Sequence, residues 1–460
     1  MRTTLKVGMF VLVSLVGAAA AQAQVWEKYL APGLTYRMEV DSDIPRTIHA
    51  LHFDLHSDAV KVVPELGQGK VYNDDKTKGR ATVSAMVKRV GALAGINASF
   101  FPYTGRPVGL MVRDGELISS PYKTRPEFGW GPNQYAHFAT STFSASYKSG
   151  DSQPVSIDTV NEEAPPDTTS LDTDTGGWAF ARTGTGTCAI LHVLGDKLVP
   201  NGDLEAEVVD VKRDVSKMPI PKGEAVIMGT GSQAAKVGEL KPGDRVVVSV
   251  HIDGFEWDKL ANAVCGGPVL LRNGNPVIDW EQEGFKENFA MKRYPRTAVG
   301  IDTHGDLWLV SVDGLLPESS GASLGELAAI MLRFGCRDAI NLDGGGSTTV
   351  NVLGVTVNRP GDGVERELAN AILFLGPTGP KDDAPLSLRA PEKLKLGDKT
   401  QISVAEKDGE RVPDGEILWS ATGGGWIDQG GLLHVDKAAP VELEAYVHGQ
   451  TLSATIAVES

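Results

Sequence analysis

Only two stretches of this chain carry the apolar spacing of an amphipathic helix, and this scarcity constrains the fold more than any other feature. The first covers roughly residues 81–91 and the second residues 323–334. The second is sharply bounded, because Ser323 and Glu326 form an S-x-x-E capping box and Gly335 follows as a stop signal. The rest of residues 24–375 is typical of strands and loops. We therefore expect an α+β fold with mixed, largely antiparallel sheets and few helices, rather than a doubly wound fold.

Breaker residues divide the chain near its C-terminal quarter. The run GPTGPKDDAP at 376–385 is rich in proline, glycine and charge, and predicts a linker at 379–385. After it, short alternating strands separated by turn signals predict a small C-terminal β-sandwich over 386–460. Its pattern around Trp419 and Trp426 resembles bacterial Ig-like domains, which fits a spacer or attachment module. Residues 24–378 form the larger predicted domain, with the polar stretch 150–177 as an exposed loop insertion.

The first 23 residues have the parts of a secretory signal peptide. Arg2 and Lys6 supply positive charge, residues 7–20 form a short apolar run, and residues 21–23 read Ala-Gln-Ala, which fits a cleavage site. We therefore expect Gln24 as the mature N-terminus of an exported protein, either periplasmic or secreted. No later segment has the length and apolar character of a membrane span, so none is expected after signal removal.

Charge and cysteine content limit the partners and the covalent framework. The net charge of −15 argues against nucleic acid, whose phosphates attract basic surfaces. Cys188, Cys265 and Cys336 allow at most one internal disulfide. A disulfide between Cys265 and Cys336 and two free buried thiols fit the sequence equally well. The sequence does not indicate an oligomeric state.

The stretch NLDGGGSTTV at 341–350 is the strongest sign of function. Asp343 comes directly after a predicted strand at 338–342, and a hairpin turning near Gly354 follows. Three consecutive glycines let the backbone approach a ligand closely or offer N–H groups as an anion nest. A P-loop would need a lysine before Ser347, and a nucleophile elbow would need a glycine where Thr349 stands. The run therefore predicts a functional turn of another kind.

This turn and several other motifs resemble, in the same order, the phosphodiester glycosidases related to N-acetylglucosamine-1-phosphodiester α-N-acetylglucosaminidase. The resemblance covers about residues 90–375, and its motifs are GINASFF at 95–101, CGGPVLLRNG at 265–274, PRTAVGID at 295–302, SVDG at 311–314 and RPGDGVERELANAILF at 359–374. It implies cleavage of the glycosidic C1–O bond of a sugar-1-phosphate diester, which yields a free sugar and a phosphomonoester. The implied substrate is a phosphate-linked glycan, such as an exopolysaccharide.

The resemblance and the chemistry suggest a role for each motif residue. A phosphomonoester leaves readily, so the main needs are phosphate stabilisation and a carboxylate near the oxocarbenium-like centre. We expect Arg296 and then Arg366 as phosphate ligands, and Asp343 and Asp313 as nucleophile or base. Hydrogen bonds to sugar hydroxyls or carboxylates are expected from Asn97, Asn341 and Asn370. Further substrate contacts are expected from Gly266, Gly267, Gly344, Gly345, Gly346 and Ser347.

Two of these residues have structural alternatives. Arg296 could instead pair with an acidic neighbour at a strand edge, and Asp313-Gly314 could be an ordinary turn. The family often has arginine after this Asp-Gly pair, whereas Leu315 follows here. That departure puts the substrate contacts around Asp313 in doubt.

Metal-binding patterns are weak in this sequence. His49, His52 and His56 fall in a segment where apolar and polar residues alternate, which favours a half-buried strand over a zinc site. The acidic run at 172–176 lacks the later glutamate of a calcium loop. A divalent cation, Ca²⁺ or Mg²⁺, bridging Asp343 to a substrate phosphate stays open. So do two alternative functions, a metal-dependent phosphodiesterase that cleaves P–O and a non-catalytic exopolysaccharide-binding or assembly protein.

Overall fold

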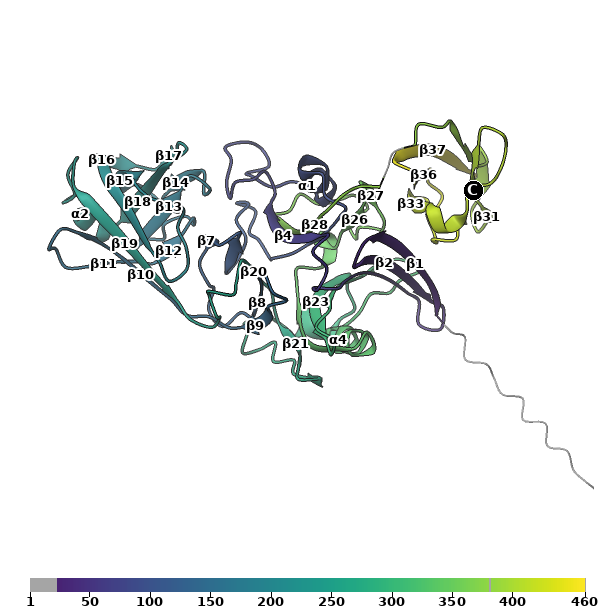
Figure 1. Ribbon diagram of the computed structural model, residues 1–460, viewed down its shortest axis with the longest axis horizontal. Helices are drawn as coiled ribbons and strands as arrows, with labels where there is room; N and C mark the ends of the chain where they lie inside the picture. Colours follow the sequence, from purple (N-terminus) through teal and green to yellow (C-terminus); the bar gives the residue numbers. More distant parts are fainter. Residues whose placement is uncertain (1–22, 380–381, 460) are drawn as a thin grey trace, which may run out of the picture.

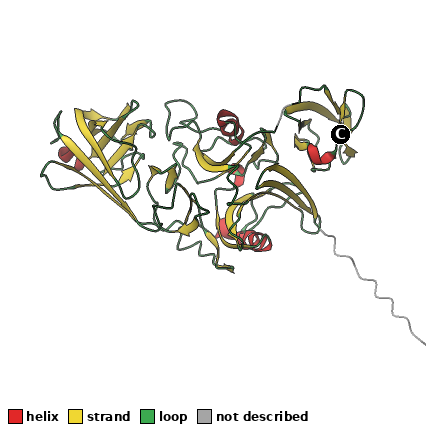
Figure 2. Ribbon diagram, viewed as in Figure 1, coloured by secondary structure: helices red, strands yellow, loops and turns green. Residues whose placement is uncertain are grey.

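The computed structural model describes residues 23–379 and 382–459 (Figure 1). The predicted signal peptide lies outside these residues except for Ala23. Strands dominate the described chain and helices are few, as the sequence predicts (Figure 2). Figure 1 shows three lobes, with a central body between an all-strand sheet on one side and the C-terminal residues on the other.

Three antiparallel sheets build the central body. The first has the order β1 (Gln24–Ala31), β2 (Leu34–Asp41), β3 (Arg46–Phe53), β24 (Leu307–Val312), β23 (Arg296–Asp302), β25 (Cys336–Asn341), β21 (Val269–Arg272) and β22 (Asn275–Pro276). The second has the order β27 (Val355–Thr356), β26 (Val350–Val352), β5 (Ala94–Asn97), β28 (Asn370–Leu375) and β4 (Lys61–Leu66). The third has the order β7 (Glu116–Ser119), β6 (Met111–Arg113), β20 (Asn262–Cys265), β8 (Glu127–Trp130) and β9 (Ala136–Ala139).

A single apolar core joins these three sheets. It combines Leu51 and Val299 of the first sheet with Ile96 and Ile372 of the second and Phe128 of the third, all buried. Burial of apolar side chains such as these is the main driving force for folding. The first and second sheets of the body therefore pack face to face through this core.

The two predicted helices cover the outer faces of this stack and are confirmed. α4 (Leu324–Arg333) starts at the capping box of Ser323 and Glu326, and Gly335 follows it with φ +85°. α4 packs Leu327 and Met331 on the outer face of the first sheet. α1 (Val83–Val90) packs Val83 and Met86 on the second sheet. The order helix, sheet, sheet, helix explains why β23 is buried along its whole length.

A further sheet is inserted between β9 and β20, and the prediction of an exposed loop at 150–177 is wrong. Its eight strands are β11 (Val155–Ile157), β10 (Phe143–Ser149), β19 (Arg245–Ile252), β16 (Asp203–Val215), β15 (Gly186–Val193), β18 (Glu224–Thr230), β13 (Thr169–Thr173) and β12 (Thr159–Val160). The short strands β14 (Trp178–Phe180) and β17 (Lys217–Pro219) and the helix α2 (Gln233–Val237) complete it. Its apolar face shares a core with Val112, Leu117 and Ala263 of the third sheet.

The prediction of a polar loop is wrong because the polar residues of β13 are buried in a strand. All five of its residues, Thr-Ser-Leu-Asp-Thr, are buried. The Asp172 carboxyl accepts a hydrogen bond from Ser170, 2.7 Å away. Burial raises the pKa of Asp172 to about 8, so this side chain is mostly uncharged at neutral pH. The acidic run at 172–176 is therefore part of a strand and its turn.

The C-terminal residues form strands where the sequence predicts them. The strands are β29 (Leu386–Arg389), β30 (Lys393–Lys395), β31 (Lys399–Gln401), β32 (Ser403–Glu406), β33 (Leu418–Gly423), β34 (Gly425–Ile427), β35 (Leu432–Val435), β36 (Val441–Val447) and β37 (Gln450–Glu459), with η2 (Asp414–Glu416) before β33. They share a core around the buried Trp419. That these strands form an Ig-like sandwich stays a prediction.

The three cysteines are free and buried in the structure, so the alternative of free thiols holds. Among the residues that the structure describes, no helix combines the length and the apolar character that crossing a bilayer requires.

Candidate active site

Strand ends from both stacked sheets meet at one end of the central body. In the first sheet, Arg296 at the start of β23 lies opposite Val312 at the end of β24, and Ala298 lies opposite Asn341 at the end of β25. The end of β5 in the second sheet joins them, because Asn97 Nδ2 donates to the Asp343 carbonyl oxygen at 2.7 Å. Motifs that are far apart in the sequence therefore converge here.

Asp343 is the carboxylate at the centre of this arrangement. It is partly buried between β25 and the short 3₁₀ turn η1 (Gly345–Ser347). Its Oδ1 accepts the Gly344 N–H at 2.9 Å. Burial raises the pKa of Asp343 to about 6, although hydrogen bonds from Ser347 and Gly344 and the charge of Arg366 oppose that shift. The group is therefore mostly ionised at neutral pH and close to the pH range in which it can exchange a proton.

Each of the three positions after Asp343 needs glycine for a different structural reason. A Cβ on Gly344 would lie 2.9 Å from the Pro295 oxygen, and Gly345 has φ +62°. A Cβ on Gly346 would lie 2.1 Å from Arg366 Nη2 and 2.2 Å from Asp362 Oδ2. The anion-nest expectation does not fit, because the N–H groups of Gly344 and Gly345 already donate to Asp343 and Pro295. The glycines instead allow close packing around the carboxylate.

Arg366 and Ser347 form a polar chain that ends at Asp343. Arg366 Nη1 donates to Ser347 Oγ at 3.3 Å, and its Nε donates to Asp362 Oδ2 at 2.9 Å. Ser347 is fully buried, whereas about a third of the Arg366 side chain is exposed. Arg366 therefore places positive charge beside Asp343 and partly faces solvent.

The three predicted asparagines are buried and serve the protein framework. Besides Asp343, Asn97 contacts Thr297 Oγ1 at 2.8 Å and accepts the Thr349 N–H at 3.1 Å. Asn370 Oδ1 accepts the Ser99 N–H at 2.9 Å. Asn341 Nδ2 donates to the Gly267 oxygen at 2.8 Å, while its Oδ1 is buried without a hydrogen-bond partner among the described residues. These side chains position the turn rather than face a sugar.

Gly266 and Gly267 bring a neighbouring segment against β25. Their N–H groups donate to the oxygens of Pro126 and Asn341 at 2.9 and 2.6 Å. A Cβ on Gly266 would lie 2.4 Å from the Asn341 oxygen, so only glycine allows this approach. Both residues therefore line the convergence point through the backbone, and their N–H groups are already occupied.

The Arg296 guanidinium is held by the protein framework through two of its three nitrogens. The residue is 1% exposed. Its Nε donates to the Ala322 oxygen at 2.9 Å, and its Nη2 donates to the oxygens of Phe289 and Lys292. The first predicted phosphate ligand is therefore committed to backbone carbonyls.

Asp313 is likewise enclosed in the framework. Its Oδ1 accepts from Asn358 Nδ2 at 3.1 Å, and its Oδ2 accepts the Arg359 N–H at 2.9 Å. His49 Nε2 lies 3.4 Å from the same carboxylate. Since Asp313 is 2% exposed, it holds the segment after β27 in place and does not offer a second carboxylate to a substrate.

Sequence reasoning missed an arginine and three phenylalanines next to these motifs. The Arg125 guanidinium carbon lies 3.8 Å from the ring centroid of Phe285 and 5.2 Å from that of Phe100. Phe285 in turn stacks on Phe289 with the ring centroids 4.8 Å apart. Phe100 belongs to the GINASFF motif, which was the available signal. Arg125 and Phe285 lie outside the quoted motifs, so only the fold identifies them.

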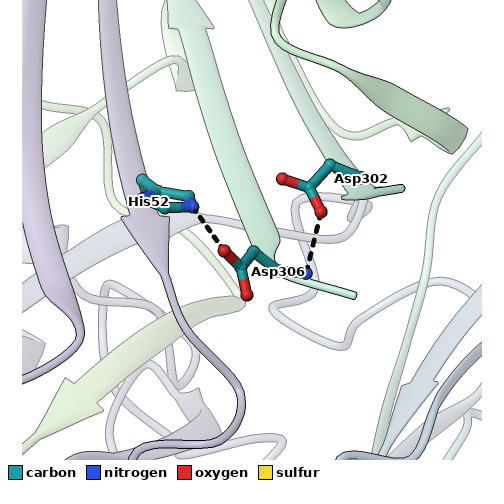
Figure 3. Close-up of side chains that lie close together, drawn as sticks. All are labelled: His52, Asp302 and Asp306. Atoms are coloured by element: carbon teal, nitrogen blue, oxygen red, sulfur yellow. Dashed lines mark hydrogen bonds and ion pairs between the residues drawn. The ribbon is translucent and has the colours of Figure 1, made fainter. Parts of the chain in front are cut away.

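Side chains that could hold a metal ion lie elsewhere in the first sheet (Figure 3). One group is His52, Asp302 and Asp306, and a second is Asp54, His56 and Asp306. His52 Nε2 lies 3.1 Å from Asp306 Oδ2. Asp302 already accepts the backbone N–H of Asp306 and Trp308 Nε1.

The position of these groups separates them from Asp343. Asp302 is the last residue of β23, whereas Arg296, beside the glycine turn, is the first. Six residue steps along a strand span roughly 20 Å. A cation held at Asp302 and Asp306 would therefore not reach a phosphate bound at Asp343.

Comparisons with known proteins show which family this chain resembles. Residues 200–375 match the sequence profile of the phosphodiester glycosidases. N-acetylglucosamine-1-phosphodiester alpha-N-acetylglucosaminidase of Bos taurus is 29% identical over 214 residues, which is 44% of this chain and 35% of the relative. The protein of the same name from Homo sapiens is 35% identical over 102 residues, 20% of each chain. The chain thus spans only about a third or less of the length of these relatives.

A solved structure supports the fold. A hypothetical protein from Synechocystis aligns with a TM-score of 0.65 and 22% identity over 77% of this chain and 64% of that one. A likeness at this level of identity shows the fold alone.

Proposed function

Because residues 200–375 of this chain match the sequence profile of the phosphodiester glycosidases, we propose that the protein hydrolyses the glycosidic C1–O bond of sugar-1-phosphate diesters. The single observation that carries the proposal is the Asp343 carboxylate. It is partly buried at a strand end, with Arg366 beside it and a pKa of about 6. A carboxylate that is ionised at neutral pH suits a nucleophile or a base.

The reaction needs one acting carboxylate and a good leaving group. Asp343 either removes a proton from a water molecule that attacks C1, or attacks C1 directly to form a glycosyl ester that water then hydrolyses to the free sugar and the carboxylate. The C1–O bond breaks, and its electron pair leaves with the phosphomonoester. Since phosphate is a weak base, the leaving group needs little protonation. Asn97 and Gly344 hold Asp343 in place, and Arg366 favours its ionised form.

The competing metal-dependent phosphodiesterase would need a cation at the same place. The two groups of metal-binding side chains lie at the other end of β23, so they do not support that reaction at Asp343. In a binding protein without turnover, the fold would be the same, but Asp343 would not need to be ionised.

The test is hydrolysis of N-acetylglucosamine-1-phosphate diesters in ¹⁸O-labelled water. We expect the label in the released sugar, and loss of turnover by at least about 100-fold in Asp343→Asn. Asp338→Asn is the matched control, since Asp338 lies on the same strand and pairs with the exposed Arg337. Label in the phosphate would identify a phosphodiesterase instead. An Asp343→Asn variant as active as wild type would exclude this role of the carboxylate.

We also propose that the substrate is a phosphate-linked glycan outside the cytoplasm, such as an exopolysaccharide, and that the protein is exported to the periplasm or secreted. β1 begins at Gln24, the residue predicted to follow signal cleavage. Cell fractionation with N-terminal sequencing tests this proposal. A cytoplasmic protein that retains Met1 would contradict it.

A further inference from the structure

Arg296, the first predicted phosphate ligand, is held by backbone oxygens through Nε and Nη2. Arg366 is paired with Asp362 at 2.7 Å. A further phosphate ligand near Asp343 needs a guanidinium or ammonium group that has no ion-pair partner within the protein. Arg125 meets this requirement.

Arg125 is a partly buried arginine without a polar partner. Within residues 23–379 and 382–459, its side chain makes no ion pair within 4.0 Å, and its Nη1 is buried with no hydrogen-bond partner. Burial lowers the pKa of Arg125, against the charges of nearby groups that include Glu283. An unpaired, desolvated guanidinium is costly in a folded protein unless a ligand uses it.

Two series of contacts connect Arg125 to the segments around Asp343. On one side, the adjoining Pro126 accepts the Gly266 N–H at 2.9 Å, and Gly267 accepts from Asn341, two residues before Asp343. On the other side, Arg125 lies over Phe100, three residues after Asn97, whose side chain bonds Asp343. The guanidinium therefore lies in the same group of segments as the candidate nucleophile.

The surroundings of Arg125 suit a phosphate group. The Arg125 guanidinium lies over Phe285, which stacks on Phe289, and the Phe100 ring is tilted by 55° to Phe285 at a centroid distance of 5.5 Å. Stacking on an aromatic ring fixes the plane of a guanidinium and so preorganises its N–H groups for phosphate. Arg125 also lies 6.0 Å from the Tyr122 ring centroid.

We propose that Arg125 binds the phosphate of the substrate. This assignment rests on the proposed function for the identity of the substrate. Arg125 thereby takes the role that the sequence predicted for Arg296.

The experiment measures binding of N-acetylglucosamine-1-phosphate and of inorganic phosphate to the full chain by calorimetry. We expect Arg125→Met to weaken binding of both probes by about tenfold or more. Arg113→Met is the matched control, since Arg113 is also partly buried but already pairs with Glu65 at 3.2 Å. It should bind both probes like wild type. Equal affinity of wild type and Arg125→Met for both probes overturns the proposal.

A second variant separates lost charge from disturbed packing. Glu283→Gln removes a carboxyl group near Arg125 that is partly ionised at neutral pH, since burial raises the pKa of Glu283 to about 7, and it keeps the shape of a side chain beside Phe285 and Gly267. It should leave phosphate binding unchanged or tighter. Weakening equal to that of Arg125→Met would assign the effect to packing and overturn the proposal. Because binding is read without turnover, a chain that hydrolyses no diester still tests the role of Arg125. In an active chain, Arg125→Met should raise KM more than it lowers kcat.

Discussion

Among single residues, burial of Asp343 lowers the stability of the folded protein at neutral pH. Its pKa is about 6 in the folded protein against an ordinary value of 3.8, and burial is the main cause. The folded state therefore holds the proton more tightly than the unfolded state does. Stability falls as the pH rises from about 4 to about 6, and it stays lower above that range. The cost is about 2 kcal/mol after allowance for partial exposure.

We accordingly predict that Asp343→Asn is more stable than wild type by about 2 kcal/mol at pH 7.5, because the amide carries no charge to bury. Below about pH 4, where the carboxyl is protonated in both states, the difference should vanish. Urea unfolding at both pH values measures it. A variant less stable than wild type at pH 7.5 would show that the ionised carboxylate contributes to folding.

At the scale of elements, Arg296 is a helix cap. Its Nη2 donates to the oxygens of Phe289 and Lys292 at the C-terminal end of α3 (Glu287–Met291), and its Nε donates to Ala322, just before α4. The last carbonyls of a helix have no partners within the helix, so a cation there is favourable. The guanidinium thus joins the start of β23 to two helices.

We therefore predict that Arg296→Lys destabilises the protein by about 3 kcal/mol, because an ammonium group cannot reach carbonyls in these directions as a planar fork does. Denaturant unfolding measures the loss. The fraction that folds should bind inorganic phosphate like wild type. Unchanged stability together with weaker phosphate binding would restore Arg296 as the phosphate ligand.

The elements also show how far sequence patterns reach. The capping box of Ser323 and Glu326 and the apolar face of residues 324–334 predict α4 correctly, since these signals are local. The strand β13 carries no such signal, because it buries Ser170 and a mostly uncharged Asp172. For the candidate site, the motifs predict which segments converge, but not which side chains stay free. The partners of Arg296 and Asp313 come from other segments and depend on the assembled fold.

At the scale of the whole molecule, a buried ion network fastens the C-terminal strands to the central body. Arg359 pairs with Glu318 and with Asp436, the latter at 2.6 Å, and its Nη2 donates to the Gly423 oxygen. Burial raises the pKa of Glu318 to about 7. The backbone N–H of Arg359 also donates to Asp313. The same residue therefore contacts the C-terminal strands and the framework next to the candidate site.

We predict that Arg359→Met destabilises the protein by about 3–5 kcal/mol, since it leaves two buried carboxyl groups without their cation. Thermal unfolding should then show the C-terminal strands melting before the central body. A triple variant with Glu318→Gln and Asp436→Asn added should recover much of the loss, because no unpaired charge remains. A single transition at the wild-type temperature in Arg359→Met would show that the network adds nothing to the attachment.

The order of Arg359 and its partners along the chain has a consequence for biosynthesis. The ribosome makes Arg359 and the loop leading to Arg366 well before it makes Gly423 and Asp436. A chain still being synthesised therefore carries this loop before its contacts with Gly423 and Asp436 can form. The attachment at Arg359, next to the framework of the candidate site, is completed only after the C-terminal strands have been made.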